Sequence, residues 1–133
     1  SRISALMSEP HIALDLPDRL IIAKPPGWEA WDHHVDYQLL EFVRAISSST
    51  WPILLDLNHN YGFLHRLDVP SSGLILAAKT YEAYYDLQMQ LSAGEIARDY
   101  VALCHGWVLP ALTQIKAHVS WKEDLPTGVG RQG

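Results

Sequence analysis

The fold is decided by the stretch Phe63-Leu64-His65-Arg66-Leu67-Asp68-Val69-Pro70-Ser71-Ser72-Gly73-Leu74-Ile75-Leu76. It joins an apolar entry, a compact group of His, Arg and Asp, a tight Pro-Ser-Ser-Gly turn and an apolar exit. Side chains two apart share a face of an extended segment, so Arg66 and Asp68 are predicted to point the same way, with His65 and Leu67 opposite. A neighbouring guanidinium keeps a carboxylate ionised, which suits attack on an electrophile. On spacing alone, a plain Arg66–Asp68 ion pair at a sheet edge is the favoured interpretation.

Length and composition indicate one soluble globular domain. The chain has 133 residues, of which 48% are hydrophobic and 19% are charged. No apolar run approaches the ~20 residues of a membrane helix, and no secretory signal pattern is seen. The single Cys104 excludes an intramolecular disulfide, so we expect an intracellular, reducing compartment and no secretion. The net charge of -5 argues against a broad phosphate-binding surface but leaves room for a local basic cleft.

Apolar periodicity and turn residues predict an α+β fold: a mixed, largely antiparallel sheet with two flanking helices. The predicted extended segments are His11–Leu14, Arg19–Lys24, Tyr61–Asp68, Gly73–Ala78, Ile96–His105 and Ile115–Trp121. The predicted helices are Asp36–Ile46, with Asp36 as N-cap, and Tyr81–Leu91, capped by Thr80 and ended by Gly94. The Gly-rich tail, Pro126–Gly133, is expected to be loose.

A second constellation lies in the segment Arg98-Asp99-Tyr100-Val101-Ala102-Leu103-Cys104. A period of two puts Arg98 and Tyr100 on one face of the predicted strand. An aromatic ring and a cation side by side could hold a planar base, the ring by stacking and the cation by contact with phosphate or carboxylate. The alternative is that Tyr100 packs as an ordinary cross-strand aromatic.

The seven His residues do not favour a metal site. His33 and His34 are adjacent and diverge in an extended loop, and no His-x-x-x-His helix is present. Cys104 and His105 point to opposite faces of a strand, so a buried structural thiol is expected. No Gly-rich phosphate loop of the Walker or Rossmann type is present.

Three motifs resemble the RluA-type pseudouridine synthases. The segment from His65 to Thr80 resembles the family's His-Arg-Leu-Asp-x-x-Thr-Ser-Gly motif and its apolar strand ending in Ala-Lys, with Ser71 where Thr is usual. Leu20–Gly27 resembles an early strand ending in Lys-Pro-x-Gly, and Arg98–Gly106 a strand of the form Lys-x-Tyr-x-Ala-x-x-x-Gly. The resemblance runs from about Asp18 to Gly106, with the motifs in the expected order.

The resemblance implies an RNA pseudouridine synthase in which Asp68 is the catalytic carboxylate. Asp68 would act on C1′ or C2′ of a uridine in ribosomal or transfer RNA, without a metal or cofactor. The base would detach, rotate and rejoin the sugar through C5. Tyr100 would stack on the target base, and Arg66 would contact the RNA backbone or hold the flipped nucleotide. Arg98 and His65 are the remaining candidate substrate-binding residues.

The family's later motif, roughly Gly-Arg-x-His-Gln-Ile-Arg, has no match here. Gly130-Arg131-Gln132-Gly133 is a superficial echo of it. In the family, the basic residue of that motif pairs with the catalytic Asp. Residues 1–133 are therefore expected to form a single catalytic domain that is truncated at its C-terminal side. The chain would then be an artificially shortened protein, a natural fragment or a reduced paralogue.

Two other functions stay open from the sequence. One is a degenerate, non-catalytic synthase-like module that binds RNA or a protein partner. The other is a small interaction domain that uses some of its five Trp residues, with Trp28 and Trp31 as candidates, at a protein interface. The alternative for those two residues is packing over the helix predicted from Asp36.

Overall fold

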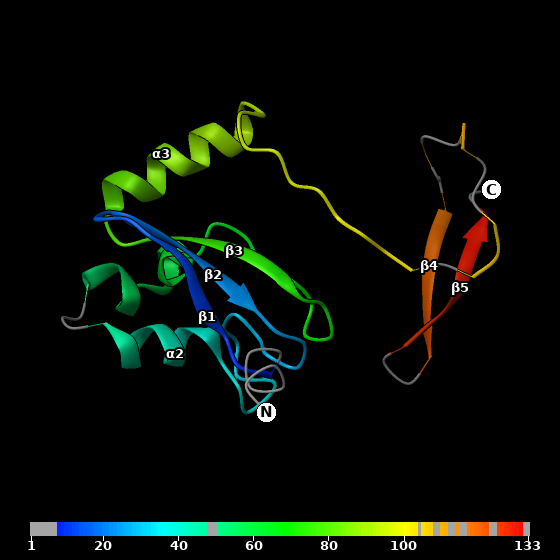
Figure 1. Cartoon of the computed structure of the whole chain (residues 1–133), viewed down its shortest axis with the longest axis horizontal. Coiled ribbons are helices and arrows are strands. Elements are labelled where there is room, and N and C mark those ends of the chain that lie inside the picture. The colour runs from blue at the N-terminus through cyan, green and yellow to red at the C-terminus, as the bar shows by residue number, and fades with distance from the viewer. Residues whose placement is uncertain are drawn as a thin grey trace. The chain divides into compact units, whose positions relative to one another are not determined.

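The computed structural model of the chain describes residues 8–47, 51–103, 105–107, 110–111, 114, 117–122 and 125–131. The chain divides into two compact units, Ser1–Arg98 and Asp99–Gly133. The first unit is a small sheet with helices and the second contains a two-stranded hairpin, so the described structure is α+β (Figure 1). Within the described ranges, no helix has the length and apolar character needed to cross a membrane.

An antiparallel sheet with the strand order β1-β2-β3 forms the centre of the first unit. Its strands are β1 (His11–Asp15), β2 (Arg19–Lys24) and β3 (Gly73–Ala78). β2 pairs with β3 along its whole length, from Arg19 opposite Ala78 to Lys24 opposite Gly73. This register brings the end of β2 against the start of β3. The segment that precedes β3, which contains Asp68, therefore lies beside the turn that follows β2.

Two helices cover opposite faces of this sheet (Figure 1). α2 (Leu39–Ile46) packs its apolar face on the cluster that contains Ile22 and Ile75. α3 (Tyr81–Ser92) packs on a second cluster, which contains Ala78 and Ile53. Alternation along β3 explains the two layers, because successive side chains of a strand point to opposite faces. The 3₁₀ segments η1 (Pro52–Leu55) and η2 (Leu57–Gly62) connect the layers.

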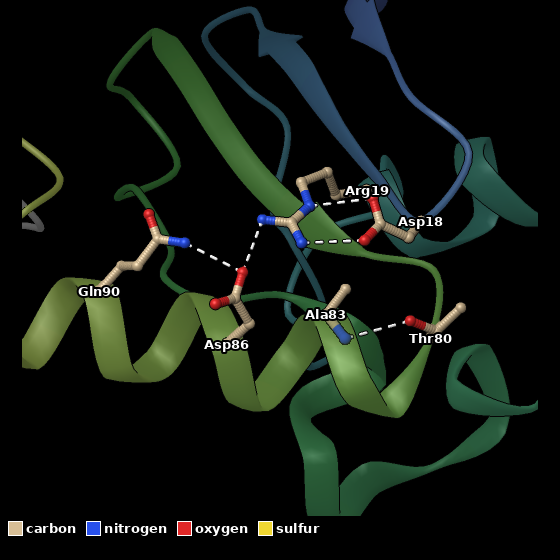
Figure 2. Close-up of polar contacts among 6 residues, drawn as sticks. All are labelled: Asp18, Arg19, Thr80, Ala83, Asp86 and Gln90. Atoms are coloured by element: carbon tan, nitrogen blue, oxygen red, sulfur yellow. Dashed lines mark hydrogen bonds and ion pairs between the residues drawn. The ribbon is translucent and has the colours of Figure 1, made fainter.

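Polar contacts tie β2 to α3 and cap the start of that helix (Figure 2). The Thr80 hydroxyl accepts a hydrogen bond from the Ala83 N–H at 3.1 Å, which satisfies one of the free donors at the helix start. Arg19 donates to both carboxylate oxygens of Asp18 and to Asp86, each at 2.9 Å. The predicted N-cap is confirmed, and the predicted C-terminal Gly94 adopts φ +73° directly after the helix.

Sequence patterns predicted three of the strands correctly and misplaced two other elements of the first unit. His11–Leu14, Arg19–Lys24 and Gly73–Ala78 are strands as expected. Asp36 is not an N-cap: the helix begins at Leu39, because residues before it form a loop closed by a parallel bridge between Glu29 and Gln38. All strand pairs in the described residues are antiparallel, and that isolated bridge is the parallel pairing among them.

The extended segment expected from Tyr61 is wrong at its start. Asn60 and Tyr61 adopt left-handed φ values of 49° and 54° inside η2, and the chain reaches the sheet only at Phe63, which forms a bridge with Ala77. Gly62 follows at φ +90°, where a Cβ would lie 2.5 Å from the Ala78 carbonyl oxygen. These left-handed residues turn the chain from η2 into the bridge between Phe63 and Ala77.

Two predictions fail in the second unit. No strand forms in the described residues of the predicted Ile96–His105 segment, where Val101 and Leu103 are fully exposed. A strand needs a partner, and the apolar face of this segment finds none among the described residues. The tail is not loose over Leu125–Arg131, which forms β5 and pairs with β4 (Ala117–Lys122). β4 matches the predicted strand Ile115–Trp121 from residue 117 onward. Ile115 and Cys104 lie outside the described residues.

Candidate active site

The segment around Asp68 is held from beneath by Lys24, the last residue of β2. The Lys24 ammonium donates to the carbonyl oxygens of Pro25, Val69 and Ser71, at 2.9, 3.0 and 2.5 Å. Gly27 adds a backbone hydrogen bond to the same Val69 oxygen at 2.8 Å. The turn that carries Asp68 is therefore bound to the end of β2 through its carbonyl groups.

Lys24 is only 2% exposed, which is rare for a lysine. Strand alternation puts it on the buried face together with Leu20 and Ile22. Burial lowers the pKa of Lys24, and the nearby Asp68 charge opposes that shift. A lysine ammonium has three donors, and the three carbonyls take all of them. Lys24 thus acts as a buried clamp on the backbone.

Asp68 itself is exposed, and its backbone carbonyl accepts from the Ser71 N–H at 2.9 Å. Leu67, one residue before, is half-buried and packs against the core. Arg66 and Asp68 are exposed on either side of it, so the predicted alternation holds. The result is an accessible carboxylate on a turn whose own backbone is fixed at two points.

The predicted Arg66–Asp68 ion pair is wrong. Arg66 instead pairs with Asp32, with its Nη1 2.7 Å from the Asp32 Oδ2. Its guanidinium also lies 5.1 Å from the ring centre of Trp31, which is buried and stacked on Phe63. Two contacts from one loop therefore outcompete the carboxylate two residues away.

The loop that carries Asp32 is closed by the buried Glu29. Its carboxylate accepts from the His34 N–H at 3.0 Å and from the Gln38 amide at 2.9 Å, and contacts the His34 ring at 3.0 Å. Burial disfavours the charged form of Glu29, but the hydrogen bonds from Gln38 and His34 outweigh it and lower its pKa. An ionised Glu29 thus fixes both ends of the loop around Asp32.

His65 attaches the entry of the segment to β3. Its Nε2 accepts from the Leu76 N–H at 3.1 Å, so this nitrogen carries no proton and the ring is neutral. Burial, and to a lesser degree the charge of Arg98, lower the pKa of His65. Its Nδ1 is buried without a hydrogen-bond partner in the described structure.

A family described as RNA pseudouridylate synthase matches residues 19–130, which include Lys24, Asp68 and Tyr100. The chain belongs to the RNA pseudouridylate synthase family. This agrees with the resemblance seen in the three sequence motifs.

Curated relatives fall in the same family. A ribosomal large subunit pseudouridine synthase D of Nitrosomonas europaea is 47% identical over 105 residues, covering 78% of this chain and 27% of the relative. A ribosomal large subunit pseudouridine synthase C of Buchnera aphidicola is 33% identical over 88 residues, covering 65% and 25%. The chain therefore spans about a quarter of the length of these relatives. No solved structure gives a significant match.

Arg98 and Tyr100 are the remaining predicted site residues of this synthase-family chain. Arg98 ends the first unit and lines an open groove along α3 together with Leu64 and Gln88. Tyr100 belongs to the second unit and is 67% exposed. Since no strand forms here, a face shared by Arg98 and Tyr100 is not defined by the backbone.

Sequence reasoning missed Lys24, Asp32 and Trp31 as parts of this site. The sequence did contain a signal for Lys24. It lies on the same face of β2 as Leu20 and Ile22, where strand alternation predicts a buried apolar residue. Nothing local marked Asp32 as the partner of Arg66. Within the described residues, no group of three or more His, Cys, Asp or Glu could hold a metal ion.

Proposed function

We propose that the protein is an RNA pseudouridine synthase that isomerises uridine in structured RNA, with Asp68 as the catalytic carboxylate. The observation that carries this proposal is the exposed Asp68 on a turn fixed by the buried Lys24. Ribosomal RNA is the first substrate to test, because two relatives are named as synthases for the large ribosomal subunit; transfer RNA is the second.

The reaction breaks the bond between N1 of the base and C1′ of the sugar, and forms a bond between C5 and C1′. The C5 proton is released and N1 gains one, so substrate and product are isomers. No electron is transferred, and the proposed reaction uses no metal or cofactor. A carboxylate close to a sugar that develops positive charge stabilises it, as in glycoside hydrolysis. Asp68 needs only access to C1′ or C2′ and a fixed position.

The other candidate residues are proposed to bind RNA. Arg66 would contact the RNA backbone or hold the flipped nucleotide, and Tyr100 would stack on the target base with Arg98 contacting its phosphate. His65 is proposed as a further substrate contact; its Nε2 is bonded to the Leu76 N–H and its Nδ1 is buried, so neither ring nitrogen is open to a substrate in this structure. Residues 1–133 are proposed to form a single catalytic domain. A reducing intracellular compartment stays a prediction.

The test is incubation of the complete gene product with uridine-containing ribosomal RNA, and detection of pseudouridine by mass spectrometry after chemical labelling. We expect Asp68→Asn to reduce product to background. The matched control is Asp36→Asn, which removes another exposed carboxylate of the same unit and should retain activity.

Each alternative outcome has a definite meaning. Product formation that survives Asp68→Asn would remove Asp68 from its proposed role. A folded protein that yields no product from ribosomal or transfer RNA is not the proposed enzyme. If it still binds RNA, the non-catalytic RNA-binding module is the function that remains.

A further inference from the structure

Asp32 has an unusual backbone. It adopts φ 119° and its neighbour His33 adopts φ 63°, although neither is a glycine. Side-chain-bearing residues rarely adopt such values, and their free-energy cost must be offset by the surrounding structure. Here the offset comes from the loop closed by Glu29, which accepts hydrogen bonds from His34 and Gln38. The chain thus maintains a strained residue beside the proposed active site.

The strained loop contacts Arg66 by two independent interactions. Asp32 forms the 2.7 Å ion pair with its guanidinium, and the ring of Trp31 lies beneath it at 5.1 Å. Trp31 is 8% exposed and stacks on Phe63 with ring centres 5.4 Å apart, so its ring is a fixed platform. Arg66 itself is half-exposed and could adopt other rotamers.

The most obvious alternative partner of Arg66 is Asp68. Their Cα atoms are at most ~7 Å apart along the chain, which is within reach of an extended arginine side chain. Among the described residues, no cation forms an ion pair with the Asp68 carboxylate. Lys24 lies near enough to sense its charge, but its donors are taken by backbone carbonyls. Asp68 is thus left free while the nearest arginine is bound elsewhere.

We propose that Asp32 is a positioning residue that holds Arg66 on Trp31 and away from Asp68, so that the Asp68 carboxylate stays free for the substrate. The proposal rests on the proposed role of Asp68 in catalysis. Without the Asp32 carboxylate, Arg66 pairs with Asp68 for part of the time. With a partly exposed Arg–carboxylate pair of typical strength, the fraction of molecules in which Asp68 is unpaired would be about two- to fivefold smaller than in the native protein.

The first experiment measures the pairing without any activity. Asp32→Asn keeps the shape of the side chain and tolerates positive φ, but removes the charge. We record the guanidinium ¹⁵N resonances of Arg66, assigned through Arg66→Gln, before and after adding Asp68→Asn. In the Asp32→Asn background the Arg66 signals should move when Asp68 is neutralised, whereas in the native background they should not. Equal responses in the two backgrounds overturn the proposal.

The second experiment measures turnover in a double-mutant cycle. Asp32→Asn should lower kcat/KM by about two- to fivefold in the native background, and should have no effect in the Arg66→Gln background. A loss of the same size in both backgrounds shows that Asp32 does not act through Arg66. If Asp32→Asn does not fold, Asp32→Gly carries the same test, because glycine adopts φ 119° without strain.

The two experiments separate this inference from the proposed function. If native protein is inactive, or Asp68→Asn is active, the proposed function fails, while the NMR comparison still decides whether Asp32 keeps Arg66 from Asp68. If the NMR signals respond as expected but turnover of Asp32→Asn equals that of native protein, the positioning role is refuted.

Discussion

Lys24→Met tests the clamp beneath Asp68 directly. Methionine keeps the apolar stem in the buried position but removes the ammonium that bonds the carbonyls of Pro25, Val69 and Ser71. Hydrogen bonds from charged donors contribute ~1.5–3 kcal/mol each, and the carbonyls left behind lose a partner. Removing a buried charge returns several kcal/mol of desolvation cost. The balance is a loss of about 2–4 kcal/mol in the free energy of unfolding.

This loss is measurable by thermal unfolding. A change of 1 kcal/mol shifts Tm by roughly 4–8 °C in a small domain, so the loss of about 2–4 kcal/mol in Lys24→Met should lower Tm by about 8–32 °C. The turn should also become less well fixed at temperatures where the protein stays folded. A displacement of about 1 Å at a reacting group can lower the rate ~100-fold. We therefore expect kcat to fall at 15 °C, where the variant is still native by circular dichroism.

The matched control is Lys79→Met, which removes a lysine from the opposite end of the same strand pair. Lys79 pairs with the exposed carboxylate of Asp15 and lies 5.0 Å from the ring centre of Trp51. Its loss should cost about 1–2 kcal/mol and leave kcat unchanged. If Lys24→Met unfolds within 2 °C of the native protein and keeps its kcat, the clamp is not what holds Asp68.

Three further outcomes are expected. Gly62→Ala should lower unfolding stability by about 2–4 kcal/mol in urea titration, because its Cβ would lie 2.5 Å from the Ala78 oxygen at φ +90°; an unchanged midpoint would contradict this geometry. Thr80→Ala should cost about 1 kcal/mol through the lost N-cap, and Thr80→Ser, which keeps the hydroxyl, should cost much less. Native stability should fall as the pH drops below 6.5, because the lowered pKa of His65 means that the unfolded chain takes up the proton more readily. Protonated Nε2 could no longer accept from Leu76, and His65→Gln should lose this part of the pH dependence in urea titrations at pH 5 and 7.

Local signals account for the parts of the fold that the sequence predicted. Arg19–Lys24 and Gly73–Ala78 combine apolar β-rich runs with turn residues on both sides, and both are strands. Thr80 and Gly94 cap α3 because short-range backbone chemistry determines helix ends. These features involve residues a few positions apart, where local interactions restrict the backbone to few conformations.

The failures involve partners distant in sequence. The segment Ile96–His105 has the alternation of a strand, but β-propensity reflects packing on a neighbour. In the described residues Ile96 packs against the core, whereas Val101 and Leu103 are fully exposed. The sequence pattern marked Lys24 only as the end of a strand, although two of the three carbonyls that accept from it belong to Val69 and Ser71, 45 and 47 positions later. Burial of this lysine cannot be predicted without those acceptors, because a buried charge needs hydrogen-bond partners.

The ion pair beside Asp68 also depends on a residue that is distant in sequence. Spacing correctly predicted that Arg66 and Asp68, which flank Leu67, are exposed while Leu67 packs against the core, but proximity does not decide the ion-pair partner of Arg66. Arg66 pairs with Asp32 and not with Asp68 because the loop of Asp32 is already ordered by Glu29, so less side-chain freedom is lost on pairing. The ring of Trp31 adds a second contact to Arg66. Stability and activity should therefore separate at this position. Asp32→Gly relieves the strain at φ 119°, worth ~1–3 kcal/mol, against the entropy of glycine and the lost ion pair at ~1–2 kcal/mol together. The two contributions nearly cancel, so the variant should unfold close to the native Tm and yet lose turnover. A large fall in Tm in parallel with turnover would mean that Asp32 serves the fold alone.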